Sequence, residues 1–460
     1  MDETRNLVAK CHDLRYEHLP EEVVDRTRYL LLDYLGVAAR GALSDSSLPV
    51  QRVVKGMGKI GRGAVVIGTS MRADPAYAAL ANGAAAHSLE LDDVVNEASL
   101  HPAVAIMSAA LGAGHLAGCS GKDLIEGIVV GYEVMIRLGF TLDPAAHYAR
   151  GFHPTGTCGT MGSAVTAAKI LKLDQRGMAN ALGIAGSQAA ASMEFLADGA
   201  FTKRLHPGWA AHSGIVAALL AAEGFSGPAS ILEGKHGFLH AYSGGAFPSR
   251  LLEAWGSPYK VMRTSIKPHS CCRYKQGPID GILEIMRQHR LKASDVQEVK
   301  LGILKTGFPI VAEPRELKVN PKSVVDAQFS MPFGAAAAVL YGRASLNEYT
   351  PEKLKSRDVR AMMKRVTCVH DPELDKVFPM RWPASVSIAT RTGKVLKTRI
   401  DYPKGDPENP LTWEELIDKF NELTDPVFHE SVKRRIVDRV RSLEREGNLD
   451  RLTTLLLRKE

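Results

Sequence analysis

Ionisable side chains gather in three short segments, each next to apolar sequence rich in Ala and Gly. The first is His87-Ser-Leu-Glu-Leu-Asp-Asp93, followed by His101 directly before a proline. The second is Arg150-Gly-Phe-His-Pro-Thr-Gly-Thr157, and the third is Gly199–Gly208, with a lysine, an arginine and a histidine. Histidine changes charge near neutral pH and commonly transfers protons, whereas lysine and arginine bind anions. These residue types predict proton transfer on an anionic molecule.

A fourth segment of this kind is Ser265-Ile-Lys-Pro-His-Ser-Cys-Cys-Arg-Tyr274. Lys267 and Arg273 supply two more cations, and His269 supplies another imidazole. The adjacent cysteines lack the sequence surroundings of known nucleophilic cysteines, so a thiol nucleophile is not expected.

Structural interpretations of the same segments stay open. The acidic segment could cap a helix end and lead into a solvated loop, and His153 could be a structural histidine on a constrained turn. Lys203, Arg204 and His206 could be surface charges. The histidines do not follow zinc-ligand spacing, and neither a P-loop nor a dinucleotide fingerprint occurs. We therefore predict no metal and no cofactor, and proton transfer next to a carboxylate of a small polycarboxylate.

Composition narrows the class of protein. The 460 residues are 45% hydrophobic and 24% charged, which is typical of a folded globular chain. The net charge of +7 comes without a nucleic-acid motif, and no run reaches the ~18 apolar residues of a membrane helix. The six cysteines show no CxxC spacing and the first residues show no apolar run. We expect a cytoplasmic protein with a small anionic carboxylate as substrate, and neither nucleic acid nor membrane as partner.

The positioning elements are predicted to be mostly helices. Ala/Leu/Gly periodicity indicates helices throughout the first half, among them Pro20–Gly41, Ala103–Ala117, Gly159–Leu171 and His212–Glu223. From about Ser265 β-branched alternation predicts strands at Val296–Leu304, Ala384–Ile388 and Val395–Ile400, and helices return after 410. The expected fold is mainly α. An all-helical domain is formed by both chain ends, residues 1–264 and 403–460, with a smaller α+β lid domain, residues 265–402, inserted in it.

Several long motifs, in order along the chain, resemble those of the MmgE/PrpD family. They are Leu30–Val37, Leu89–Asp93 with His101-Pro102, Gly151–Gly159, Lys203–Gly208, Lys267–Tyr274, Asp326–Ser330 and Pro403–Pro410. The resemblance covers nearly the whole chain. It implies the two-domain fold just described, a homodimer and an active site without a cofactor.

The resemblance also implies roles for single residues. His101 and His153 match the acid/base histidines of the family, and Lys203 and Lys267 match lysines that face substrate carboxylates. These four are the expected catalytic residues. The rest of the pocket is expected to bind substrate through Glu90, Asp92, Asp93, His206, His269, Cys272 and Arg273.

Two departures bear on the reaction. Decarboxylase-like members carry Thr where Val94 stands and His where Cys272 stands. The leading hypothesis is an enzyme that removes a proton α to a carboxylate of a di- or tricarboxylic acid, as a hydro-lyase similar to 2-methylcitrate dehydratase. The alternatives are an epimerase of an iminodisuccinate-like acid, a cis-aconitate-type decarboxylase, and a non-catalytic protein that binds anionic metabolites.

Overall fold

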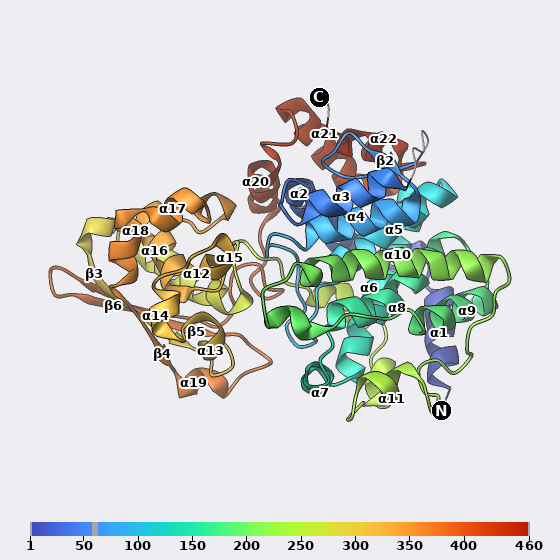
Figure 1. The fold of residues 1–460 in the computed structure, drawn as a ribbon, viewed down its shortest axis with the longest axis horizontal. Helices are drawn as coiled ribbons and strands as arrows, with labels where there is room; N and C mark the ends of the chain where they lie inside the picture. Colours follow the sequence, from blue (N-terminus) through green and yellow to red (C-terminus); the bar gives the residue numbers. More distant parts are fainter. Residues whose placement is uncertain (1, 58–62, 459–460) are drawn as a thin grey trace. The chain divides into compact units, whose positions relative to one another are not determined.

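The computed structural model describes residues 2–57 and 63–458, which divide into two compact units (Figure 1). One unit is Met1–Thr264 with Thr412–Glu460, and the other is Ser265–Leu411. The second boundary lies nine residues beyond the predicted one, since the loop after residue 402 bonds to the start of the second unit. Asp406 accepts a hydrogen bond from Ser265 at 2.6 Å, and the amide of Ile266 donates to the carbonyl of Gly405 at 2.9 Å.

The first unit is built of helices around a buried central one. Helix α8 (Pro154–Ile170) is buried along its whole length and packs against α5 (Pro102–Ala117), α6 (Gly121–Thr141) and α10 (Thr202–Ala222). The other helices are α1 (Glu3–Asp13), α2 (Glu21–Gly41), α3 (Ser47–Gly56), α4 (Pro75–Ala86), α7 (Pro144–Ala149), α9 (Gln175–Gly186), α11 (Phe238–Tyr242), α20 (Trp413–Thr424), α21 (Glu430–Arg441) and α22 (Asp450–Thr453). Strands β1 (Ala64–Val65) and β2 (Arg72–Ala73) form a small antiparallel pair.

Helices α4 and α10 lie in backbone contact, which only glycine allows. A Cβ on Gly83 would lie 2.7 Å from the Cα of Gly208, and a Cβ on Gly208 would lie 2.2 Å from the carbonyl oxygen of Leu80. Real Cβ atoms do not approach backbone this closely. The contact therefore fixes the beginning of α10 beside the end of α4.

Helix α10 begins ten residues before the predicted helix His212–Glu223. The prediction stopped short because Pro207 lies inside the helix, and a proline usually interrupts a helical pattern. Here it stands in the second turn, which places Lys203 and His206 on the helix instead of on a preceding loop.

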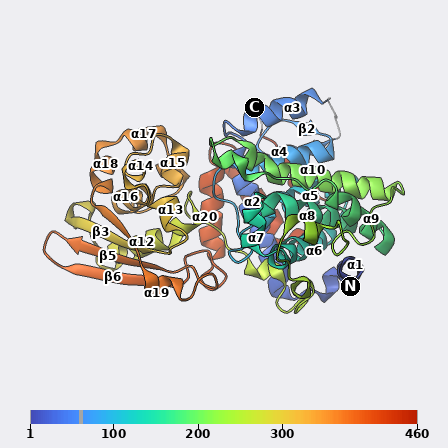
Figure 2. The same cartoon turned by 60° about the horizontal axis from the view of Figure 1, so that its bottom comes forward.

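The second unit has a four-stranded sheet in the order β4-β3-β5-β6. Strand β3 (Val296–Ile303) pairs parallel with β4 (Val366–His370) and antiparallel with β5 (Ala384–Thr390), and β5 forms a hairpin with β6 (Val395–Ile400). Helices α12 (Gln276–Gln288) and α16 (Met331–Tyr341) cover one face of this sheet (Figure 2). Short helices complete the unit: α13 (Phe308–Val311), α14 (Arg315–Lys318), α15 (Val324–Gln328), α17 (Pro351–Lys355), α18 (Arg357–Met363) and α19 (Pro372–Asp375).

The predicted fold class, mainly α with a smaller α+β part, is confirmed. The sequence did not predict β4, whose five residues include a cysteine and a histidine and alternate poorly. Among the described residues, no helix has both the length and the apolar character that crossing a membrane requires.

Candidate functional site

Four helices of the first unit bring together three predicted histidines and a fourth, His87, that was not predicted. His87 directly follows α4, His101 and His153 directly precede α5 and α8, and His206 lies in the second turn of α10. Pro102 and Pro154 begin their helices, a position where the missing N–H of proline costs nothing. Each His-Pro pair therefore holds an imidazole at the start of a buried helix.

The four imidazoles form a row. Ring centroids lie 5.1 Å apart for His101 and His87, 5.8 Å apart for His87 and His153, and 5.4 Å apart for His153 and His206. The rings of His87 and His153 are stacked, with 22° between their planes. Phe195 packs edge-on against both His153 and His206 and closes one side of the row.

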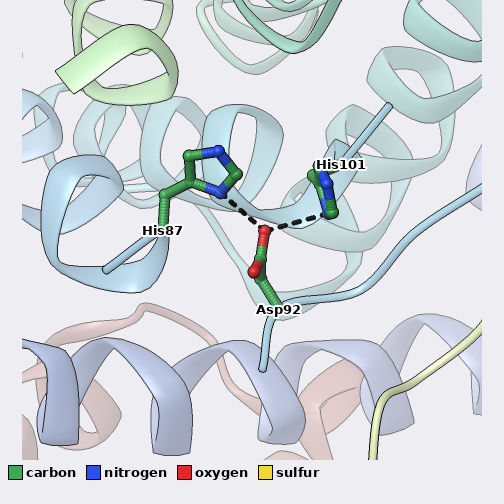
Figure 3. A group of neighbouring side chains, drawn as sticks. All are labelled: His87, Asp92 and His101. Carbon is green, nitrogen blue, oxygen red and sulfur yellow. Dashed lines mark hydrogen bonds and ion pairs between the residues drawn. The ribbon is translucent and has the colours of Figure 1, made fainter. Parts of the chain in front are cut away.

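Asp92 holds two of these rings through one oxygen (Figure 3). Its Oδ2 lies 2.7 Å from Nδ1 of His87 and 3.0 Å from Nδ1 of His101. The Nδ1 of His101 also donates to the backbone carbonyl of Asp93 at 2.6 Å. Because a carbonyl only accepts, His101 carries a hydrogen on Nδ1, and whenever the ring has no second hydrogen its Nε2 has a lone pair. His101 is thus oriented as a base.

His153 and His206 face each other through Nδ1 atoms that are 3.1 Å apart. Burial lowers the pKa of His206 to about 4, with His87 and Lys203 adding to the effect. Burial also lowers the pKa of His153, helped by the neighbouring His87 and Lys203. Both rings are therefore neutral at pH 7, and one hydrogen lies between the two Nδ1 atoms.

Lys203 supplies the positive charge next to this row. Its Nζ pairs with Oε1 of Glu90, whose backbone adopts a positive φ of 55°. The side chains of Lys203 and Glu90 keep 22% and 15% of their surface exposed, so the charge stays accessible. Arg204, the next residue, turns instead to Ser46, whose hydroxyl accepts its hydrogen bond at 3.0 Å.

Asp93 is engaged by protein groups on both oxygens. Its Oδ1 accepts from the amide of Ala103 at 3.0 Å, in the first turn of α5, and its Oδ2 accepts from the hydroxyl of Tyr132 at 2.8 Å. Burial raises the pKa of Asp93 to about 8. The arrangement fixes the start of α5 and therefore the place of His101.

The remaining predicted residues lie in the second unit. Lys267 is 2% exposed and Cys272 is 9% exposed. His269 bonds through Nε2 to Asp280 at 2.9 Å, and Arg273 donates to both oxygens of Asp406 at 2.5 and 2.7 Å. No disulfide joins any of the six cysteines, all of which lie in the part of the chain that the structure describes. The roles expected for these four residues stay predictions.

One residue of the row was missed. His87 belongs to the acidic segment but is not among the predicted site residues, although it stands five residues before Asp92 and directly follows α4. One ring nitrogen of His87, one carboxylate oxygen of Asp92 and one ring nitrogen of His101 lie within 4.8 Å of one another, a set that could also hold a cation. The N–H bond from His101 to the Asp93 carbonyl favours hydrogen bonds over metal ligation at these atoms.

Comparison with known proteins agrees with the motifs. The chain matches the model of the MmgE/PrpD N-terminal domain over residues 5–250 and that of the MmgE/PrpD C-terminal domain over residues 269–445. It is 27% identical to the cis-aconitate decarboxylase-like protein oryM of Aspergillus oryzae, over 98% of this chain and 97% of that protein.

Two further relatives carry the name cis-aconitate decarboxylase. The protein from Aspergillus terreus is 27% identical over 97% of this chain and 94% of its own length, and the protein from Homo sapiens is 27% identical over 98% and 94%. The family models together span most of both units described above. The chain belongs to the MmgE/PrpD family.

Proposed function

We propose that this chain is a lyase that transfers a proton at the carbon next to a carboxylate of a small di- or tricarboxylic acid. The observation that carries the proposal is the row of four imidazoles beside Lys203, of which His87 and His153 are buried and His101 and His206 half-buried. Neutral imidazoles can take up a proton at pH 7, and an adjacent cation attracts the carboxylate that makes the substrate anionic. Membership of the MmgE/PrpD family, with relatives named cis-aconitate decarboxylase, also supports a lyase, since decarboxylases belong to that class.

The proposed first step removes a proton from that carbon. The lone pair on Nε2 of a neutral histidine takes the proton, and the C–H electron pair moves into the adjacent carboxylate to form an enediolate. Lys203 stabilises the negative charge of the enediolate, and its ion pair with Glu90 weakens as it does so. If a hydroxyl stands on the neighbouring carbon, the electron pair returns to form a double bond and the hydroxyl leaves as water, with a proton from an imidazolium. This is dehydration, the reaction we place first.

Decarboxylation of a cis-aconitate-like acid is the second candidate, favoured by the names of the relatives. There the C–C bond to a carboxylate breaks, carbon dioxide leaves, and the carbon that receives the electron pair takes a proton from the protein. In this route a group of the protein gives a proton, whereas dehydration begins with a histidine that accepts one. The neutral state of His153 and His206 therefore favours a first step in which histidine accepts a proton.

The test is incubation in deuterated water with citrate, 2-methylcitrate, cis-aconitate and iminodisuccinate, each followed by proton NMR, ultraviolet absorbance and carbon dioxide release. Dehydration is expected to give a conjugated double bond without carbon dioxide, and epimerisation to give deuterium exchange alone. Carbon dioxide from cis-aconitate would establish the second candidate. Thermal stabilisation by these acids without exchange or turnover would identify a binding protein and contradict the proposal.

We also propose a homodimer. The side chain of Phe201, directly before α10, is 52% exposed and that of Trp209, within α10, is 44% exposed, and a second copy of the chain would bury them. Light scattering is expected to give twice the chain mass of 49.9 kDa. A monomer at micromolar concentration would contradict this proposal and leave the proposed chemistry untouched.

A further inference from the structure

His87 occupies the middle of the row of imidazoles. It is 1% exposed, and its ring lies between those of His101 and His153, the two histidines expected to transfer protons. Burial lowers its pKa to about 4 in spite of the neighbouring Asp92, so the ring is neutral at pH 7. His87 is thus a buried, neutral imidazole in contact with both of these histidines.

Packing does not account for a histidine at this place. Its Nε2 is buried and has no hydrogen-bond partner among residues 2–57 and 63–458. Leaving a buried polar atom unpaired costs about 1–3 kcal/mol, which an apolar ring of similar size would avoid. The bond made by Nδ1 must therefore provide something that an apolar ring cannot.

That bond ends on the oxygen that also holds His101. Oδ2 of Asp92 accepts from Nδ1 of His87 at 2.7 Å and lies 3.0 Å from Nδ1 of His101. Since a neutral His87 always keeps its hydrogen on the side of the carboxylate, Asp92 is held in one orientation whether or not His101 has taken a proton. Figure 3 shows the carboxylate between the two rings.

We propose that His87 is a positioning residue, which holds Asp92 so that this carboxylate and the Asp93 carbonyl keep His101 turned with Nε2 toward the substrate. The proposal rests on the proposed function, in which His101 is one of the proton-transferring groups. A similar use of a carboxylate to orient a catalytic imidazole is well known in hydrolases. What is new here is a second imidazole that orients the carboxylate.

Two amides that replace different nitrogens of the ring provide the test. His87→Asn keeps an N–H donor near the place of Nδ1, whereas His87→Gln puts its amide near the place of Nε2. A group misplaced by about 1 Å can lose about 100-fold in rate. We expect losses in kcat of that order for His87→Ala and His87→Gln with KM changed less than threefold, and recovery of most of the loss in His87→Asn.

His115→Asn, at the far end of α5, is the matched control and should keep the kcat of the wild type. Equal losses in the Asn and Gln variants, or a rise in KM without loss of kcat, would overturn the proposal. A stoichiometric divalent ion in the purified protein, whose removal by EDTA abolishes turnover, would also overturn the proposal. The side chains of His87, Asp92 and His101 would then be metal ligands.

A second readout does not require turnover. In protein labelled with 15N-histidine, the Nδ1 protons of His87 and His101 should give separate downfield signals. We expect the His101 signal to shift in His87→Ala and to return toward its place in His87→Asn. An unmoved signal would show that His87 does not act on His101. If the wild type turns over none of the acids, the proposed function fails while this measurement still decides the role of His87.

Discussion

A neutral pair of histidines that share one hydrogen offers two different groups on its outer nitrogens. Of His153 and His206, the ring that donates through Nδ1 has a lone pair on Nε2, and the ring that accepts carries its hydrogen on Nε2. One ring can therefore take a proton while the other can give one, and exchange of the shared hydrogen reverses the roles. Elimination of water needs both actions in succession, which is why we place the pair at the centre of the chemistry.

Removal of His153 should accordingly affect turnover more than binding. We expect His153→Ala to lower kcat by about two to four orders of magnitude with a smaller change in KM, as for a lost general acid or base. Steady-state kinetics on the substrate found by NMR is the measurement. Near-normal turnover in this variant would make His153 structural and leave His101 as the preferred base.

Lys203 should behave differently because it binds a carboxylate both before and during the reaction. We expect Lys203→Ala to raise KM and to lower kcat, and Lys203→Arg to recover only part of either, since a planar guanidinium does not replace a compact ammonium. Glu90→Gln removes the competing carboxylate and should lower KM. A Lys203→Ala enzyme with both constants unchanged would show that the carboxylate binds elsewhere.

The lowered pKa of His206 predicts a pH dependence of stability. In the unfolded chain this side chain binds a proton as the pH falls through about 6.5, whereas in the folded protein it does so only near pH 4. The unfolded state thus binds more protons between these values, and the free energy of unfolding falls as the pH is lowered. We expect denaturant melts between pH 4 and 7 to show a shallower fall in His206→Gln.

Asp93 contributes to the pH dependence of the free energy of unfolding with the opposite sign to His206, and this contribution is present in the wild type and in His206→Gln alike. Its pKa is raised to about 8, so the folded protein keeps a proton that the unfolded chain releases above about pH 4. Its contribution to stability is lost as the pH rises toward 8. If His206→Gln has the same pH profile of stability as the wild type, the pKa of His206 is the same in the folded protein as in the unfolded chain.

At the scale of the helices, the sequence predicted which functional residues lie near the helix ends better than it predicted the residue at which each helix begins. The predicted helix from Gly159 missed the first five residues of α8, Pro154–Cys158. The Ala-rich runs of α5 and α8, and the start of α5 to within one residue of Pro102, were evident, because proline and small residues have strong local preferences. The extension of α10 through Pro207 was not, since tertiary packing there outweighs the local preference against proline.

The spacing of residues along the sequence could not predict that these helix ends lie close together. His87 and His206 belong to helices more than a hundred residues apart in the chain, and what joins them is the backbone contact of α4 with α10 at Gly83 and Gly208. Glycine signals freedom of the backbone in a sequence but does not name the partner. Only family motifs, and then the fold, could place His101, His153 and Lys203 in one cluster.

The contact of α4 with α10 gives a prediction at this scale. Gly208→Ala puts a methyl group 2.2 Å from the Leu80 carbonyl, so the helices must separate. We expect a loss of about 1–3 kcal/mol in stability, as for other overpacked cores, and lower kcat because His206 moves away from the row.

Gly56→Ala, at the end of α3, is the matched control. A Cβ there meets no atom within 4 Å, and alanine favours the helix by up to about 1 kcal/mol. Chemical denaturation and kinetics of both variants make the comparison. A Gly208→Ala protein as stable and active as the wild type would show that the two helices can part without affecting the site.

At the scale of the whole chain, the second unit is an insertion with a core of its own. Buried side chains from α12, α16 and the four-stranded sheet form one hydrophobic cluster, which includes Ile282, Phe333 and Val299. Its first and last segments are tied together, since Asp406 is 3% exposed and accepts from both Ser265 and Arg273. Inserted domains commonly have ends that lie close together in this way.

We therefore expect residues 265–411 to fold when expressed alone, with a single cooperative thermal transition followed by circular dichroism. Asp406→Ala should destabilise this fragment by about 3–5 kcal/mol, because it leaves the buried guanidinium of Arg273 without its carboxylate. Asp401→Ala is the matched control: its carboxylate is 44% exposed beside Arg399, where an ion pair adds at most about 1 kcal/mol. A fragment without a cooperative transition would show that the cluster needs the first unit to form. If instead the fragment folds and Asp406→Ala has no more effect than Asp401→Ala, the tie between its ends is dispensable and the core alone defines the unit.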